Sequence, residues 1–328
     1  MDDIVKKIND LGIKHYGFID FKRLDESYDF FKYRKDKGLD SSFEEESVEN
    51  RINFKNIMED GKTIMSFAFP YSYSVENPKG EYFSLYALGE DYHIILRDYL
   101  EEIAVLIRNK GYKAEVFVDN NQLPERYLAY IAGLGEIGRN SMLITETYGS
   151  YVFLGEIITN YHLESTERKE IRVEDYITCG DCDLCVKACP ASILGKGIYD
   201  TKKCLSFISQ KKELDKKEMI MLKGRLFGCD TCQIVCPLNK GKKESYIERF
   251  RPKDYMLNPD ARDLLCLTNK DFRKYRDTSA GWRGKKLLQR NALVEIKRRN
   301  LNYDKKCINT EYLEKYENLL DEIYKRDL

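Results

Sequence analysis

Eight of the ten cysteines lie between residues 179 and 236, and their spacing is that of a metal-cluster ligand set. The first four occur in the segment CGDCDLCVKACP, residues 179–190, which follows the pattern C-x2-C-x2-C-x3-C-P. The second four are Cys204 and the three cysteines of GCDTCQIVCP, residues 228–237. Together these thiols supply the eight ligands that two [4Fe–4S] clusters require. The sequence therefore predicts an electron-transfer unit.

The spacing also predicts which cysteines share a cluster. Two intervening residues allow a tight turn to direct successive sulfurs to different irons of one cubane, whereas the cysteine before the proline reaches the other cluster, as in two-cluster ferredoxins. The resulting first cluster has the ligands Cys179, Cys182, Cys185 and Cys236, and the second has Cys189, Cys204, Cys229 and Cys232. Pro190 and Pro237 follow the crossing cysteines and restrict the backbone there.

Two zinc sites of four cysteines each are the alternative for these residues. Structural zinc sites usually carry two separated C-x2-C pairs, so the continuous run favours iron–sulfur clusters. The remaining cysteines, Cys266 and Cys307, have no partner nearby in the sequence. We expect Cys266 to be a core residue and Cys307 to be incidental.

Two clusters conduct electrons, so the site that receives the electrons is expected elsewhere in the chain. Asp119 ends a predicted strand, and in α/β sheets ligands bind beyond the carboxyl ends of strands. A carboxyl group there, partly buried beside an apolar ligand, would have a raised pKa and could donate a proton, whereas the alternative role is an Asx turn. The segment GLGEIG, residues 133–138, indicates a tight loop or, more weakly, a phosphate-binding loop.

Composition limits the class of protein. The 328 residues suffice for two or three domains, and equal numbers of basic and acidic residues, 55 each, exclude a uniformly basic nucleic-acid binder but not a local patch. Mean hydropathy is −0.56, and no apolar run approaches the roughly 18 residues of a membrane span. The N-terminal segment lacks the apolar region of a secretory signal. We therefore expect a cytoplasmic protein that does not enter a membrane.

Alternating patterns predict the elements that position these residues. Strands are expected at 15–20, 63–72, 113–119 and 150–160, and helices at 2–11, 91–109 and 124–133. The acidic segment 36–60 is expected to be a surface loop or a short helix. The predicted fold class is α+β: an α/β domain over 1–165, a ferredoxin-like domain with two [4Fe–4S] clusters over 166–244, and a helical region over 245–328.

The sequence resembles the epoxyqueuosine reductase family over most of residues 80–240. The resemblance is carried by the eight cysteines and by YALGEDYH (86–93), VDNNQLPER (118–126), AGLGEIGRNSMLI (132–144), YGSYVFLGEIITN (148–160) and KCLSFISQ (203–210), in the family's order. The chain differs from the family at Glu136, where an aromatic residue is usual, in the acidic stretch 43–47, and in its short helical tail.

The resemblance implies a cobalamin- and iron–sulfur-dependent enzyme that completes queuosine in tRNA. It implies base-off cobalamin between the first domain and the ferredoxin-like unit, reduced through the clusters. Asp119 matches the aspartate that protonates the departing epoxide oxygen before loss of water leaves the alkene. The residues that would contact the cofactor are Arg139, Asn140, Leu143, Leu154, Ser206 and Asp230.

Basic residues gather near the C-terminus, and the implied substrate makes them candidates for contact with the tRNA anticodon stem-loop. A charge run alone is more often a solvated face, but a basic helix can also bind phosphates. Phe272, Tyr275 and Trp282 are expected either to stack on an unpaired base or to form a core contact. The basic candidates are Lys285, Lys286, Arg290, Arg298 and Arg299.

Two other functions remain open from the residues. The chain could be a corrinoid and iron–sulfur reductase of a small molecule, similar to reductive dehalogenases, or an electron-transfer protein without a catalytic site. As a reductase it would need an external donor, such as a flavodoxin or ferredoxin system. We expect it to act as a monomer.

Overall fold

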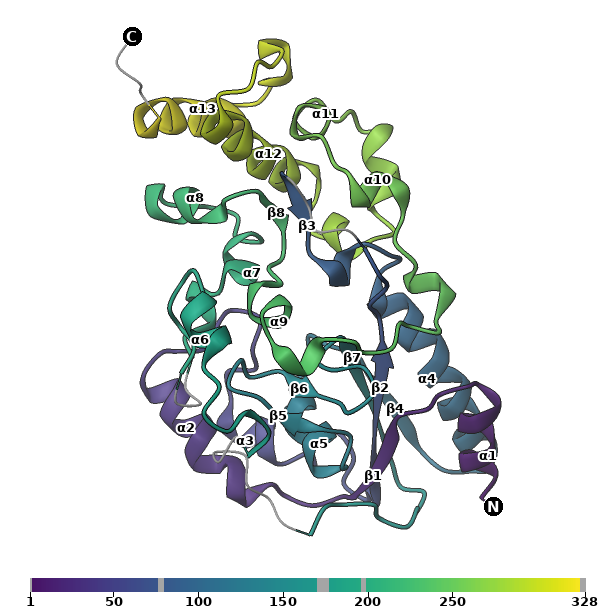
Figure 1. The fold of residues 1–328 in the computed structure, drawn as a ribbon. Helices are drawn as coiled ribbons and strands as arrows, with labels where there is room; N and C mark the ends of the chain where they lie inside the picture. Colours follow the sequence, from purple (N-terminus) through teal and green to yellow (C-terminus); the bar gives the residue numbers. More distant parts are fainter. Residues whose placement is uncertain (1, 76–79, 170–176, 196–198, 325–328) are drawn as a thin grey trace.

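A four-stranded sheet organises the N-terminal half of the chain (Figure 1). The computed structural model describes residues 2–75, 80–169, 177–195 and 199–324. The sheet order is β1-β2-β7-β4, and each neighbouring pair is antiparallel. The strands are β1 (Tyr16–Asp20), β2 (Thr63–Pro70), β7 (Val152–Thr159) and β4 (Ala114–Phe117), which confirms the four predicted strands with slightly shorter bounds.

The sheet is buried on both faces because strand β2 carries apolar side chains on alternate sides. Met65, Phe67 and Phe69 pack with helices α1 (Asp3–Asp10) and α4 (Tyr92–Asn109). Ile64 and Ala68 pack with α5 (Glu125–Ile131) on the opposite face. Since burial of each large apolar side chain contributes roughly 1.5–3 kcal/mol, the two helical layers hold the strand ends firmly. The three predicted helices are confirmed.

The predicted fold class, α+β, is confirmed, but the antiparallel pairing changes the reason for placing a site at Asp119. The rule that ligands bind at the carboxyl ends of strands applies to parallel sheets. Here β4 runs antiparallel to β7, and the loop after β4 instead meets the N-terminus of α4.

The acidic segment contains a short helix, as expected. Helix α3 (Val48–Ile52) packs against α2 (Tyr28–Asp36) and covers the sheet on the α5 side. The segment is more than a surface loop, however, because Glu44 lies among buried arginines at a cavity described below.

The cysteine-bearing region consists of short helices and small β pairs. The helices are α6 (Leu184–Ala188), α7 (Leu205–Ile208), α8 (Lys216–Leu222) and α9 (Thr231–Ile234). Strand β8 (Arg225–Phe227) pairs in parallel with β3 (Tyr82–Phe83), and β5 (Glu136–Ile137) pairs with β6 (Leu143–Ile144). The β3–β8 pair joins this region to the chain just before the YALGEDYH motif.

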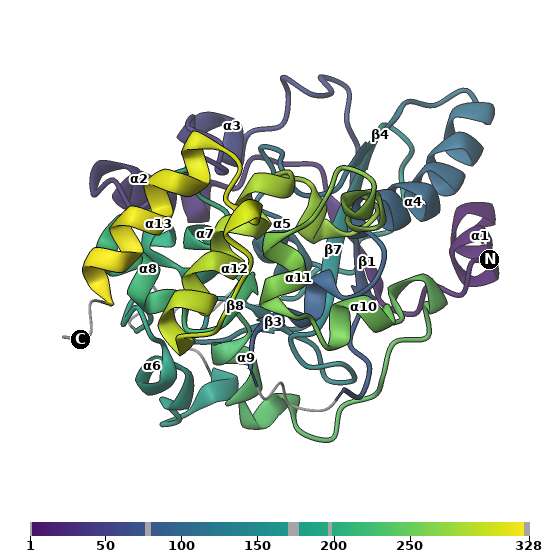
Figure 2. The ribbon, with the colours of Figure 1, turned by 90° about the horizontal axis from the view of Figure 1, so that it is seen from above.

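The C-terminal helices share a third core with residues 83–88 and 205–227, and Figure 2 shows them lying over that region. They are α10 (Asp254–Leu257), α11 (Ala261–Leu265), α12 (Lys285–Arg299) and α13 (Glu311–Ile323). The expectation for Cys266 and Cys307 is wrong, because the two form a disulfide across 41 residues of sequence. Packing of α11 on α12 and of α12 on α13 brings them together, which local spacing does not reveal.

Candidate functional site

The cysteines divide into two groups of four around two cavities. Cys189, Cys204, Cys229 and Cys232 line a large cavity of about 1260 Å³. Cys179, Cys182, Cys185 and Cys236 line a small cavity of about 90 Å³. The two groups have the same members as the quartets that the spacing predicts, and only the second quartet borders the large cavity.

Each quartet also receives a hydrogen bond from an arginine. The backbone N–H of Arg139 donates to Sγ of Cys179 at 3.4 Å, and Nε of Arg225 donates to Sγ of Cys229 at 3.2 Å. Hydrogen bonds to cluster sulfurs are one of the features that set reduction potential. The polar surroundings therefore suit thiolates that carry the negative charge of a cluster.

Asp119 lies on the wall of the large cavity, in a tight loop between β4 and α5. Asp119 and Asn120 both adopt left-handed backbone angles, with φ of 44° and 46°, which are costly outside glycine. Asn121 holds this loop, because its Nδ2 donates to the Asp119 carbonyl at 3.1 Å and its Oδ1 accepts from the Leu123 N–H at 2.7 Å. The asparagines of the VDNNQLPER motif thus fix the position of the carboxylate.

The carboxylate of Asp119 is surrounded by proton donors. The Tyr92 hydroxyl donates to it, and Nε2 of His93 lies 3.6 Å from Oδ2. Enclosure raises the pKa of Asp119, but the hydrogen bonds from His93 and Tyr92 outweigh this and leave the pKa below its usual value. The ligand-free site therefore favours the ionised form of Asp119, whereas the raised pKa is expected beside a bound apolar ligand.

The protons are held by the neighbours of Asp119. Burial lowers the pKa of His93, but the hydrogen bonds to Asp119 and Asp91 outweigh this effect and raise the pKa to about 9. Burial and the charge of Asp119 raise the pKa of Glu125 to about 8. His93 is therefore a cation and Glu125 a neutral acid at neutral pH. Sequence reasoning missed both, although YALGEDYH and VDNNQLPER contain them.

A further carboxyl group lies beneath this site. Glu156 on β7 is fully buried and pairs across the sheet with Ser66, whose hydroxyl donates to its Oε1 at 3.2 Å. Its Oε2 has no hydrogen-bond partner among the described residues. Burial and the nearby Glu125 raise the pKa of Glu156 well above its usual value, which favours the neutral form of this side chain.

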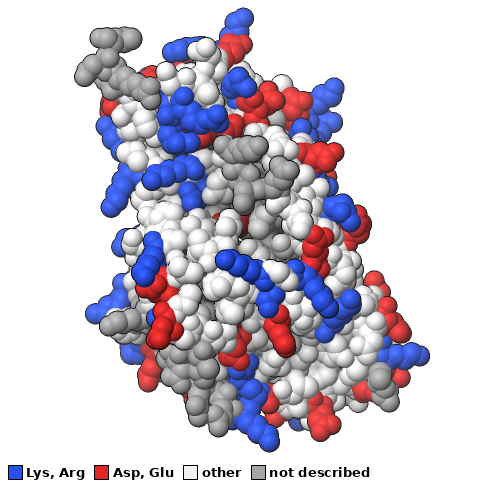
Figure 3. All heavy atoms as spheres, in the orientation of Figure 1, with Lys and Arg blue, Asp and Glu red and all other residues white. Residues whose placement is uncertain are grey.

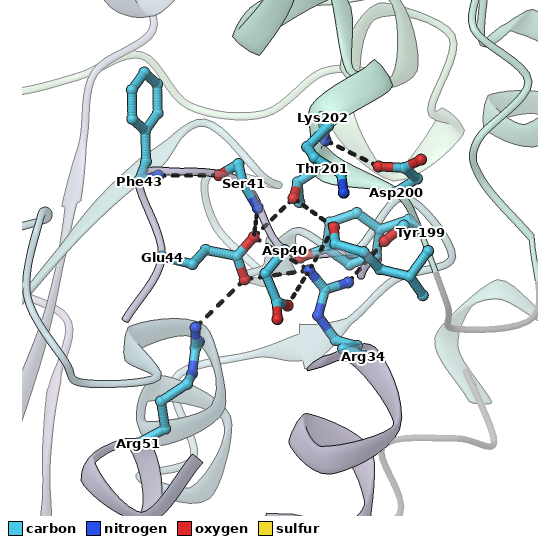
Figure 4. A network of polar contacts seen from close by, with 12 residues as sticks. Arg34, Asp40, Ser41, Phe43, Glu44, Arg51, Tyr199, Asp200, Thr201 and Lys202 are labelled. Carbon is cyan, nitrogen blue, oxygen red and sulfur yellow. Dashed lines mark hydrogen bonds and ion pairs between the residues drawn. The ribbon is translucent and has the colours of Figure 1, made fainter. Parts of the chain in front are cut away.

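Arginines and one glutamate line another part of the cavity, where segment 28–52 meets segment 199–201 (Figure 4). The Glu44 carboxylate lies between Arg34 at 3.1 Å and Arg51 at 3.3 Å and accepts from the Thr201 hydroxyl at 2.7 Å. Arg34 also donates to the Tyr199 carbonyl at 2.7 Å, and its side chain is 2% exposed. A buried ion pair is costly to break, so the network holds the acidic segment against the cysteine-bearing region.

The six residues that the resemblance assigned to the cofactor divide into two groups. Asn140, Leu154 and Ser206 line the large cavity. Leu143 is 2% exposed in the core on the α5 side, and Arg139 lies beside the first cysteine quartet. Asp230 is also buried, where it accepts hydrogen bonds from the Ser84 hydroxyl and, at 2.8 Å, the Leu85 N–H. The side chains of this second group hold the site's framework and are not among the described residues that line the large cavity.

The glycine-rich segment forms a tight loop. A Cβ at Gly135 would lie 2.5 Å from the carbonyl oxygen of Ile144, so the β5–β6 hairpin needs glycine there. Glu136, the departure from the family pattern, pairs with Arg168 at 2.9 Å. These contacts explain both features of the segment without a bound phosphate.

The basic C-terminal residues are less available than the sequence suggests. Arg290 is fully buried and donates to the Lys211 carbonyl at 2.6 Å, so it cannot contact a phosphate. Arg298 pairs with Glu295 at 2.6 Å, and Arg299 pairs with Glu81. Lys285 and Lys286 remain without an ion pair among the described residues.

The aromatic candidates also separate. Phe272 and Tyr275 are 7% and 5% exposed in the C-terminal core, whereas Trp282 is 48% exposed. Nε1 of Trp282 donates to Oε1 of Gln210 at 3.0 Å. Phe272 and Tyr275 therefore form core contacts, which is the alternative to base stacking. Of the three aromatic candidates, Trp282 alone presents its ring to solvent.

Two protein-family models match this chain, one over the cysteine-bearing region and one over part of the N-terminal half. A family model described as "4Fe-4S double cluster binding domain" matches residues 178–239, which decides against the zinc alternative. A model described as "Epoxyqueuosine reductase QueG, DUF1730" matches residues 51–120. No helix in the described part of the chain is long and apolar enough to cross a membrane.

Similar proteins agree over most of the chain. Epoxyqueuosine reductase of Listeria monocytogenes is 33% identical over 317 residues, covering 90% of this chain and 80% of the relative. That of Lactococcus garvieae is 36% identical, covering 90% and 86%.

Solved structures are similar as well. The Streptococcus thermophilus epoxyqueuosine reductase has a TM-score of 0.85 at 30% identity, covering 99% of this chain and 90% of that one. An epoxyqueuosine reductase bound to an epoxyqueuosine-modified tRNA-Tyr stem loop has a TM-score of 0.84 at 27% identity, covering 97% and 98%. A Bacillus subtilis structure with its catalytic aspartate loop swung out of the active site has a TM-score of 0.86 at 28% identity, covering 97% and 87%. The chain therefore belongs to the epoxyqueuosine reductase family of oxidoreductases.

Proposed function

We propose that the protein reduces the epoxide of epoxyqueuosine in tRNA to the alkene of queuosine. The observation that carries this proposal is the large cavity, where the second cysteine quartet and Asp119 line the same space. Reducing power and a proton-handling carboxylate thereby meet at one site. Family membership favours this reaction over a small-molecule reductase or an electron carrier without a catalytic site.

We propose base-off cobalamin as the cofactor of the cavity, in addition to two [4Fe–4S] clusters. The volume of about 1260 Å³ exceeds the roughly 300–1,000 Å³ typical of pockets for drug-sized ligands, as a tetrapyrrole requires. A corrinoid supplies a strongly reducing cobalt centre. The side chains proposed to hold it are Asn140, Leu154 and Ser206, while Arg139, Leu143 and Asp230 would act through the framework.

The test is an anaerobic assay on tRNA that carries the epoxide. The protein with reconstituted clusters, added cobalamin and a chemical reductant should produce queuosine-containing tRNA, whereas the same protein without cobalamin should not. Equal product in both samples would contradict the role of the corrinoid. Absence of product with all components present would contradict the proposed substrate.

The residues around Asp119 match the proton demand of this reaction. Reduction of an epoxide to an alkene and water consumes two electrons and two protons. Asp119, as the group proposed to protonate the departing oxygen, must receive a proton, and His93 and Glu125 each hold one at neutral pH. The catalytic aspartate loop named for the Bacillus subtilis structure supports the assignment of Asp119.

The reaction rate is expected to fall as pH rises through about 8 to 9. Both neighbours have raised pKa values, about 8 for Glu125 and about 9 for His93, so their protons are present below this range and lost above it. Single-turnover rates across this range measure the effect. In Glu125→Gln the decline should move toward about 9, the pKa of His93. A rate that does not change through this range would contradict the proton supply.

Lys285 and Lys286 are proposed as the phosphate contacts of the basic helix. In Figure 3, basic and acidic side chains are intermixed over the upper part of the molecule. Arg298 and Arg299 are themselves in ion pairs, with Glu295 and Glu81. Changing both lysines to Ala should weaken tRNA binding and reduce the salt slope of log K by about two. Lys113→Ala, at the start of β4, is the control. A slope equal to that of the unchanged protein would exclude these contacts.

The remaining expectations stay proposals. We propose that the chain acts as a cytoplasmic monomer on the anticodon stem-loop and receives electrons from a flavodoxin or ferredoxin system. The eight cluster thiols must stay available to iron, which suits a reducing compartment. The division into units 1–165, 166–244 and 245–328 also remains a proposal, since the third core includes residues from all three.

A further inference from the structure

Large apolar side chains are exposed beside the first cysteine quartet. Leu184 on α6 is 48% exposed and directly precedes Cys185, and Ile234 on α9 is 50% exposed and lies two residues before Cys236. Helices α6 and α9 pack against each other, as Figures 1 and 2 show. The exposed apolar residues therefore lie on two packed helices, each next to ligands of the first quartet.

Basic residues lie close in sequence to these apolar side chains and to the ligands of the first quartet. Lys240, Lys242 and Lys243 follow Cys236 within seven residues, and Lys187 lies on α6 with its side chain 71% exposed. With Arg139 beside Cys179, the surface has five basic residues. Four acidic residues lie close to them in sequence or by contact: Asp181, Asp183, which pairs with Lys187 at 2.9 Å, Glu146, whose carbonyl accepts from Lys242, and the exposed Glu244, which follows Lys243. Five basic residues against four acidic ones leave this surface with a small excess of positive charge.

The two quartets border different cavities, and this difference indicates the order in which electrons pass through the two clusters. The second quartet borders the large cavity, whereas the first borders a separate small cavity at which Pro237 is exposed. Electrons that reach the cavity through both clusters must enter at the first. The entry point and the exposed apolar and basic residues therefore coincide.

We propose that Leu184, Lys187, Ile234, Lys240 and Lys243, here called the entry surface, dock a small acidic electron-transfer protein. This inference rests on the proposed function and identifies the surface that takes up its reducing equivalents. The step is a single-electron transfer: the donor's reduced flavin or iron–sulfur group is oxidised, the first cluster is reduced, and no bond is broken. An apolar centre with a charged rim is the usual anatomy of a protein interface.

The positive charge of the lysines on the entry surface favours an acidic partner protein. Complementary charge raises the association rate and suits the small, transient interfaces of electron-transfer partners. A second copy of this chain would place the same basic residues opposite each other, which like-charge repulsion disfavours. The proposal therefore commits to an acidic donor.

The experiment uses the full chain with both clusters and a purified acidic flavodoxin as the probe. Two readouts are measured: the Kd of oxidised flavodoxin at increasing salt, and the rate at which reduced flavodoxin bleaches the cluster absorbance. The double variant Lys240→Glu/Lys243→Glu and the variant Leu184→Glu are compared with Val105→Glu. Val105 is 46% exposed on α4, away from the cysteines.

We expect both entry-surface variants to weaken binding and slow cluster reduction by about tenfold or more, with Val105→Glu unchanged. The charge variant should also lose most of the salt dependence. Reduction by titanium(III) citrate should be equal in all proteins with equal iron content, which separates docking from damage to the clusters. Unchanged flavodoxin binding in both variants would overturn the proposal, as would self-association that only these variants abolish. Neither readout uses tRNA or cobalamin, so the proposed function can fail independently.

Discussion

Replacing Asp119 with Asn is expected to lower turnover of the epoxide by about 10²–10⁴-fold, the usual contribution of a general acid. The amide keeps the shape of the side chain and can still accept a hydrogen bond from Tyr92, but it can neither receive nor deliver a proton. Because the negative charge is lost, the pKa of His93 should also fall, since Asp119 is one of the groups that raise it. Single-turnover product formation measures the first effect, and titration of the His93 ring by NMR measures the second.

The control for this variant is Asp60→Asn. Asp60 is an exposed aspartate that pairs with Lys113 at 2.9 Å, outside the cavity lining, so its loss should leave turnover unchanged. Iron content and cobalamin uptake should be equal in both variants and in the unchanged protein. Full activity of Asp119→Asn would exclude Asp119 as the proton donor, and an unmoved His93 pKa would exclude the contact between the two side chains.

The elements of the first domain could be predicted because their apolar periodicity reports burial directly. The 4, 3 and 4 spacing of Leu96, Leu100, Ile103 and Ile107 is the buried stripe of α4, and all four are fully buried. The two cysteine runs could be recognised because the cluster geometry is imposed locally by turns of two and three residues. The grouping of Cys236 with the first run and of Cys189 with the second rests instead on the pattern of two-cluster ferredoxins, because each lies far in sequence from the other ligands of its quartet.

Contacts between distant segments could not be predicted in this way. The sequence places Arg290 on a basic helix face, but its guanidinium is buried in the core. There it donates to the backbone carbonyls of Ser209, Lys211 and Lys212. Similarly, the charge of Asp119 depends on His93 and Tyr92 at the start of α4, which the sheet brings to the same loop. Packing between distant segments determines which charged side chains are solvated, and the periodicity of the sequence does not show this packing.

Iron content is the second measurement with a large expected effect. The unchanged protein should bind about eight irons per chain in two four-iron clusters. Cys204→Ser should reduce this to about four, because serine replaces a ligand of the second cluster while the first quartet remains intact. The change should also abolish turnover, because the second quartet is the one that lines the large cavity. Iron and sulfide analysis, with the electron paramagnetic resonance spectrum of the reduced protein, measures the loss.

Cys266→Ser is the matched control, since it removes the disulfide with Cys307 and no proposed cluster ligand. It should keep about eight irons and full turnover.

Cys236→Ser gives a sharper contrast, because it removes a ligand of the first quartet and leaves the second intact. Its remaining irons should still respond to titanium(III) citrate but no longer to reduced flavodoxin, since the cluster beside the entry surface is lost. If Cys204→Ser and Cys236→Ser responded alike to both reductants, the order of the two clusters along the electron path would be wrong.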